Sequence, residues 1–170
     1  MSKSQICFDK TKVTMTAFGR DVTVTNNVRN ELNKLRTPSE VVFSTTQSGA
    51  NGKPYYPRQF PAGSWIVTDV VAHDKLKTDG TPMEPYLYPY FLATNAHQTV
   101  PVYKVDASDG HQKIGASDGT AEDWGYGLHH STSSTTLGCI KIVKQEDLRW
   151  LVDQIKAAWH DNQIVRMEVV

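Results

Sequence analysis

The apolar residues of this chain mostly alternate with polar residues in short runs, and one segment near the carboxyl terminus instead repeats them at helical spacing. Alternation is typical of β-strands, because successive side chains of a strand point to opposite faces. It predicts strands over residues 12–18, 21–25, 41–43, 65–71, 100–105 and 164–170. Residues 145–160 predict an amphipathic helix, because apolar residues recur there every three or four positions. The pattern therefore indicates a single domain over residues 1–170 that is mainly β with one main helix.

Three other segments are less regular. Residues 27–35 suit a short helix that Pro38 limits. Prolines within residues 85–92 predict an edge strand or an extended loop, because proline cannot donate to the hydrogen-bond ladder. Residues 108–122 contain two Asp-Gly steps and predict a loop.

Composition narrows the classes of partner. Of the 170 residues, 39% are hydrophobic and 21% charged, which is ordinary for a globular domain. The 18 basic and 18 acidic side chains balance. We therefore expect no nucleic-acid partner, which would need a concentrated basic surface. No stretch reaches the roughly 20 apolar residues that span a bilayer, so we also expect no membrane insertion.

The two cysteines stand in different contexts. Cys7 lies in an apolar run, which favours a buried, inert thiol. Cys139 follows Gly138 at the end of a loop rich in Ser and Thr, where a reactive thiol is expected. Two cysteines are too few for a disulfide framework. Because no Cys/His cluster accompanies them, the sequence predicts no metal site, and nothing in it calls for a cofactor.

Residues 126–142 carry the pattern that points to chemistry. His129 and His130 precede Cys139 by ten and nine positions. A thiol attacks as its thiolate, and a neighbouring imidazole can take its proton and later return it to the leaving amine. A strand with the histidine, a tight loop and a second segment with the cysteine would bring the two side chains face to face. Gly138 leaves room for the substrate and keeps backbone N–H groups available for an oxyanion.

The segment around Cys139 also resembles a known signature. Thr136-Leu-Gly-Cys-Ile-Lys141 is similar to the Ser/Thr-His-Gly-Cys-Ile/Val-Arg element of L,D-transpeptidases, and Gly127-Leu-His129 resembles their upstream histidine element. The resemblance covers roughly residues 48–142, and its short spacing is most similar to the L,D-transpeptidase-like effectors of type VI secretion systems. Leu137 departs from the family, in which a histidine directly precedes Gly-Cys.

The resemblance implies a β-sandwich-like catalytic domain that acts on the tetrapeptide stems of peptidoglycan. Cys139 would attack the carbonyl before the terminal D-alanine, with His129 as base, and form a thioester acyl-enzyme. Water as acceptor makes the protein an L,D-carboxypeptidase. A free D-amino acid gives exchange, and a second stem gives an L,D-transpeptidase cross-link. The sequence leaves these three outcomes open.

The same resemblance assigns roles to the neighbouring residues. His129 is favoured as the base because it follows Gly-Leu as in the family element, whereas His130 alternates to the opposite strand face. The remaining histidines stand singly in polar surroundings and are interpreted as surface residues. The residues expected to contact the substrate are His130, Ser131, Thr136, Lys141, Trp124 and Tyr126.

The expected location and partners follow from the resemblance and the amino terminus. Residues 1–12 lack the apolar block of a signal peptide. We therefore expect a protein made in the bacterial cytoplasm and secreted to act in the periplasm of a target cell. Its expected partners are peptidoglycan stems, a secretion apparatus and a cognate immunity protein.

Three alternative interpretations stay open. A papain-like peptidoglycan amidase is disfavoured because such enzymes usually place the cysteine before the histidine. A wall- or virion-associated binding module with a degenerate site would keep its function when Cys139 is replaced. A secreted structural protein would carry the Gly-Cys loop by accident, and its Cys139 would not react with thiol reagents.

Overall fold

The structure is a computed structural model that describes residues 5–25, 41–44, 59–106, 112–114, 119–131 and 139–170. Within these residues the chain is mainly β-strand with one helix, which confirms the prediction from periodicity. Eight strands close a barrel in the order β1-β12-β5-β6-β10-β11-β3-β2. Their bounds are Ile6–Phe8 (β1), Arg166–Val169 (β12), Gly63–Ala72 (β5), Tyr90–Thr94 (β6), Gly127–His130 (β10), Ile140–Ile142 (β11), Arg20–Thr25 (β3) and Thr14–Ala17 (β2).

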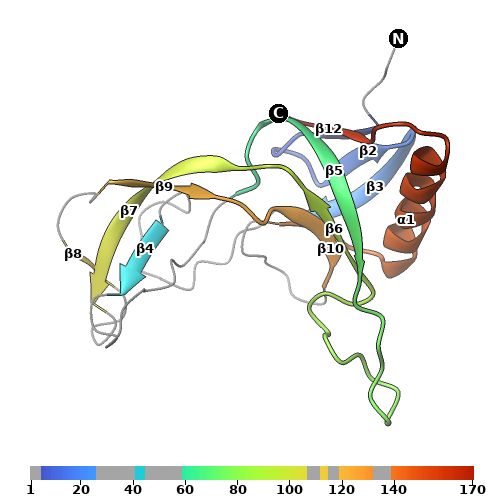
Figure 1. Ribbon diagram of the computed structural model, residues 1–170, viewed down its shortest axis with the longest axis horizontal. Coiled ribbons are helices and arrows are strands. Elements are labelled where there is room, and N and C mark those ends of the chain that lie inside the picture. The colour runs from blue at the N-terminus through green and yellow to red at the C-terminus, as the bar shows by residue number, and fades with distance from the viewer. Residues whose placement is uncertain (1–4, 26–40, 45–58, 107–111, 115–118, 132–138) are drawn as a thin grey trace.

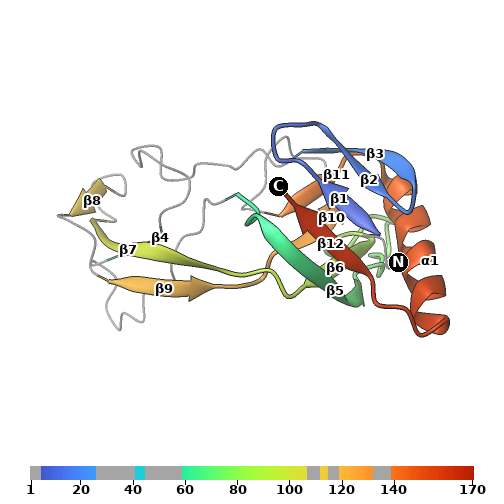
Figure 2. The same cartoon turned by 90° about the horizontal axis from the view of Figure 1, so that it is seen from above.

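A second sheet extends from the barrel on the side away from the helix (Figures 1 and 2). Its central strand, β7 (Gln98–Asp106), pairs in parallel with β4 (Val41–Ser44). It also pairs antiparallel with β8 (Gln112–Ile114) and β9 (Thr120–Asp123). This arrangement of a closed barrel with an attached sheet differs from the β-sandwich that the resemblance implies.

The two ends of the described chain meet in the barrel. β1 and β12 pair in parallel, with Ile6 opposite Met167 and Phe8 opposite Val169. All four of these side chains are buried in one apolar cluster that fills the barrel. The barrel therefore closes through a contact between residues about as far apart in sequence as the chain allows.

The helix α1 (Gln145–His160) follows β11 almost directly and contacts β6, β10 and β11. Its apolar stripe is buried in the same core, and each Leu, Val or Ile of the stripe stabilises the fold by roughly 1.5–3 kcal/mol relative to an exposed position. Arg20 on β3 fixes the start of the helix, because it is 2.8 Å from the Asp147 carboxylate and lies over the Trp150 ring. The buried residues of the stripe are Leu148, Leu151, Val152, Ile155 and Ala158.

Several predictions from the sequence need correction. β6, within the proline-containing block, is not an edge strand, because it pairs with both β5 and β10. β6 begins at Tyr90, directly after Pro89, so the proline lies outside the hydrogen-bond ladder of the strand. β8 and β9 lie within the segment predicted as a loop. Cys7 is exposed, because it alternates along β1 with the buried Ile6 and Phe8. The predicted helix over residues 27–35 lies outside the described residues.

No helix within the described residues has the length and apolarity that a bilayer crossing requires.

Candidate active site

The candidate site lies where β10 and β11 run side by side in parallel. His129 is opposite Lys141, and Leu128 is opposite Ile140. One residue further back, the Gly127 N–H donates a hydrogen bond to the Cys139 sulfur. Because residues two apart on a strand share a face, His129, Lys141 and Cys139 lie on one face of this strand pair. Leu128 and Ile140 point the other way, into the core.

His129 and Cys139 are therefore diagonal neighbours across the two strands. His130 has the opposite orientation along β10, and its Nδ1 is 2.9 Å from the Ile142 carbonyl oxygen. The pairing thus distinguishes the two histidines: His129 shares its face with the thiol, and His130 does not.

The surroundings of Cys139 favour the neutral thiol. Burial raises the pKa of the thiol to about 11, and the negative charge of Asp123 adds to this effect. The hydrogen bond from the Gly127 N–H acts in the opposite direction, but it is the smaller influence. The thiol itself points to the Gly125 carbonyl oxygen, 3.8 Å away. Cys139 is consequently protonated at neutral pH and needs a base to become a nucleophile.

The surroundings of His129 favour a neutral imidazole. Burial lowers the pKa of the ring, and the charges of His130 and Lys141 lower it further. Hydrogen bonds with the backbone of His130 and Tyr86 oppose this shift by favouring the protonated ring. Nδ1 is 3.0 Å from the His130 carbonyl oxygen, which can only accept, so Nδ1 carries the proton.

Phe91 and Gly127 form the apolar part of the same face. Phe91 on β6 is the register partner of His129, and the centroids of the two rings are 6.0 Å apart. A Cβ atom at Gly127 would lie 2.4 Å from the Phe91 ring and 2.4 Å from the Leu92 carbonyl oxygen. Glycine is therefore required at this position, because any side chain would push β6 and β10 apart.

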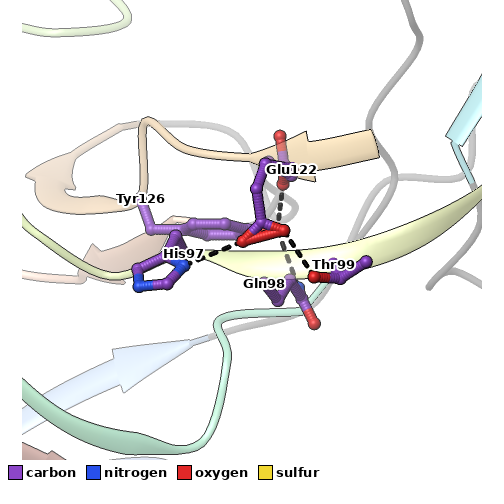
Figure 3. A network of polar contacts seen from close by, with 6 residues as sticks. His97, Gln98, Thr99, Glu122 and Tyr126 are labelled. Atoms are coloured by element: carbon purple, nitrogen blue, oxygen red, sulfur yellow. Dashed lines mark hydrogen bonds and ion pairs between the residues drawn. The ribbon is translucent and has the colours of Figure 1, made fainter. Parts of the chain in front are cut away.

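A chain of polar groups supports Asp123 next to the thiol, and Figure 3 shows its members Gln98 and Tyr126. The Tyr126 hydroxyl donates to the Asp123 carboxylate, and Gln98 Nε2 donates to the Tyr126 oxygen at 2.7 Å. Gln98 also donates to the Gln59 carbonyl oxygen at 3.1 Å. Tyr126 is only 3% exposed, so it acts on the site through Asp123 and does not form an accessible wall.

Trp124 lies one residue from Asp123 and is 59% exposed. Its ring stacks on the His97 ring, with centroids 4.3 Å apart and 21° between the planes. His97 Nδ1 is 3.1 Å from Glu122, which also accepts a hydrogen bond from Thr99 (Figure 3). The sequence predicts His97 as a surface residue, and its side chain is 39% exposed while it takes part in this network.

The other predicted site residues fall into two groups. Lys141 and Ser131 are buried, at 8% and 4% exposure. Gly138 and Thr136 lie outside the described residues, so the predicted oxyanion donors remain a prediction. Sequence reasoning missed Asp123, Phe91 and Gln98, because none of them stands in a motif. Phe91 reaches the site through strand pairing, and Asp123 reaches it through the turn at Gly125. Among the residues the structure describes, no group of three or more histidine, cysteine or acidic side chains is arranged to hold a metal ion.

In comparisons with known proteins, the chain matches no protein-family model, no curated protein and no solved structure.

Proposed function

We propose that the protein is a cysteine enzyme of the L,D-transpeptidase type that cleaves the bond before the terminal D-alanine of peptidoglycan tetrapeptide stems. The observation that carries the proposal is the parallel pairing of β10 with β11, which gives Cys139 a buried histidine on the same face. The sequence resemblance around Cys139 supplies the substrate class. The barrel is accordingly proposed to be a variant of the L,D-transpeptidase-like domain.

Acylation begins from a neutral pair. With a thiol pKa of about 11 and a lowered imidazole pKa, a resting thiolate–imidazolium pair is disfavoured. His129 therefore takes the thiol proton as the sulfur attacks the carbonyl carbon. The carbon–nitrogen bond to D-alanine then breaks, and the imidazolium returns its proton to the leaving amine. The product is a thioester between Cys139 and the shortened stem.

Lys141 supplies a fixed positive charge on the same face. It is opposite His129 in the register and two residues after Cys139. A cation in this position can bind a carboxylate of the stem and stabilise the thiolate as it forms. It also keeps His129 neutral and able to accept a proton.

The acceptor completes the reaction. Water gives up a proton to His129, attacks the thioester and regenerates the thiol, which makes the protein an L,D-carboxypeptidase. A D-amino acid or the side-chain amine of another stem gives exchange or cross-linking by the same route. For an antibacterial effector in the periplasm of a target cell, trimming and exchange both deplete the stems that D,D cross-linking needs. An immunity protein would protect the producing cell.

A second candidate is a wall-binding module whose site no longer turns over. The observation that favours it is the environment of Cys139, because burial and the Asp123 charge both act against a thiolate. Such a module would bind peptidoglycan equally well with alanine at position 139.

The test is mass spectrometry of purified disaccharide-tetrapeptide after incubation with the protein. We expect the wild type to remove one alanine, and Cys139→Ala to leave the stem intact. Cys7→Ala is the matched control, because Cys7 is the other cysteine and is exposed on β1. It should react like the wild type. An unchanged stem with wild type, together with equal wall binding by wild type and Cys139→Ala, would favour the binding module.

A further inference from the structure

We propose that Trp124 and His97 form a stacking platform for one pyranose ring of the glycan strand. The proposal rests on the proposed function, because it assigns the sugar portion of the same substrate. We define the platform as these two rings together with Glu122 and Thr99.

The platform is built before any ligand arrives. His97 is held by three neighbours: the Trp124 ring stacked on it, the Trp65 ring edge-on at 5.4 Å, and the Glu122 carboxylate at 3.1 Å. Trp65 is in turn fixed by a hydrogen bond from its Nε1 to the Pro61 carbonyl oxygen at 3.0 Å. A ring that is already oriented loses little conformational freedom on binding, which favours affinity.

Trp124 offers an accessible aromatic surface of the size of one sugar ring. It remains 59% exposed although His97 is stacked on it. The electron-rich face of an aromatic ring attracts the C–H groups on the apolar face of a pyranose, and both surfaces gain by leaving water.

Polar groups accompany the rings on the same side of the β7–β9 pair. Thr99 is opposite Glu122 in the register, and continuing the ladder by one residue pairs His97 with Trp124. The Glu122 side chain is 46% exposed. Its carboxylate oxygens therefore lie next to the aromatic rings, where sugar hydroxyls and N-acetyl groups can donate to them.

Trp124 offers one exposed ring to a ligand. Among the described side chains of residues 98–99 and 119–126, it is the one large apolar residue that is exposed. A single exposed ring matches a single sugar ring in size, whereas a stable protein interface buries about 800 Å² on each partner.

The distance to Cys139 suits the proposed substrate. The Gly125 carbonyl oxygen is 3.8 Å from the sulfur, so the Cα atom of Trp124 lies within about 10 Å of it. Three extended residues span roughly 10 Å. The stem between a sugar at Trp124 and the carbonyl of its third residue is therefore of the same length as the separation between the Trp124 backbone and the thiol.

The first experiment measures binding without catalysis. Cys139→Ala protein is titrated with chitotetraose, the N-acetylglucosamine tetramer, and tryptophan fluorescence is recorded. We expect a saturable fluorescence change. Trp124→Ala should abolish it, and Trp159→Phe on α1 should leave it in place. Trp124→Tyr should retain the binding itself, which calorimetry measures. Equal chitotetraose affinity with and without Trp124, or no binding to the Cys139→Ala protein, would overturn the proposal.

The second experiment measures preference. Wild type should have a KM for the disaccharide-tetrapeptide about ten-fold lower than for the free tetrapeptide, a ratio that corresponds to about 1.4 kcal/mol. Trp124→Ala should bring the two KM values together, mainly by raising the KM for the glycosylated stem. The same KM ratio in wild type and Trp124→Ala would contradict the platform. This result is distinct from a failure of the proposed function. In that case the wild type would be inactive on the stem but would still bind chitotetraose through Trp124.

Discussion

His129 and Lys141 are register partners on the parallel strands β10 and β11, and the charge of Lys141 helps to keep the His129 imidazole neutral. The same pairing sets Cys139 on the face that these two side chains share. A neutral base, a neutral thiol and a fixed cation therefore lie together on one sheet face.

The two histidines should differ sharply in their effect on turnover. His129→Ala should lower kcat on the tetrapeptide by about 10²–10⁴-fold, because general-base catalysis contributes that much. His130→Ala should cost less than about ten-fold, because its ring lies on the other face and bonds to the Ile142 carbonyl oxygen. Circular dichroism and the melting temperature of both variants control for folding. Equal losses of kcat in the two variants would contradict the assignment of different roles to the two faces of β10.

The activity should persist into mild acid. The lowered pKa of His129 keeps the ring neutral below its ordinary value of 6.5, so the acid limb of kcat/KM should have its midpoint below that pH. The free energy of unfolding should depend on pH in the same direction. The contribution of the neutral, buried His129 ring is complete above pH 6.5 and is lost as the pH falls and the ring becomes protonated. Lys141→Gln should move the acid limb upward, because it removes a charge that opposes protonation. A midpoint at or above 6.5 in the wild type would contradict the buried, neutral base.

The thiol should react slowly with alkylating reagents when no substrate is bound. In a Cys7→Ala background, the rate of modification by iodoacetamide should rise with pH toward a midpoint of about 11. Asp123→Asn should shift this midpoint downward, because the carboxylate disfavours the thiolate. Tyr126→Phe serves as the comparison, since it removes the hydrogen bond to Asp123 and leaves the charge. A midpoint near neutral pH would instead indicate a preformed ion pair.

Gly127 should tolerate no side chain. Gly127→Ala places a Cβ atom 2.4 Å from the Leu92 carbonyl oxygen and the Phe91 ring, so we expect a loss of more than about 2 kcal/mol and a disturbed site. Gly80→Ala is the control. Gly80, unlike Gly127, has a positive φ, and nothing lies within 4 Å of its Cβ position, so only the backbone cost of about 1 kcal/mol applies. Urea unfolding of both variants measures the difference.

The local elements were largely predictable from the sequence. The three- and four-residue spacing from Leu148 to Ala158 predicted the helix. The patterns of residues 21–25, 65–71 and 164–170 predicted β3, β5 and β12. The polar strands β8 and β9 were missed because they have little apolar alternation of their own and are stabilised by pairing with β7. Barrel closure was also missed, since nothing local in Ile6 or Met167 indicates that they pair.

The site was predictable only in part. The motif led to Cys139, and alternation separated His129 from His130. The carboxylate of Asp123 was not predictable, because it approaches the sulfur through the turn at Gly125 and not through any spacing in the sequence. The exposure of Cys7 was missed for a related reason: an apolar context does not reveal which face of a strand is buried.

Cys139 is proposed to form an acyl-enzyme with His129 as its base, and intact-protein mass spectrometry can detect this intermediate. A reaction with disaccharide-tetrapeptide is stopped by a rapid acid quench. The wild type is expected to gain the mass of the disaccharide-tripeptide acyl group on Cys139, and His129→Ala to gain almost none on the same timescale. An adduct on Cys7, or one that forms equally fast in His129→Ala, would contradict it. So would consumption of the stem by Cys139→Ala.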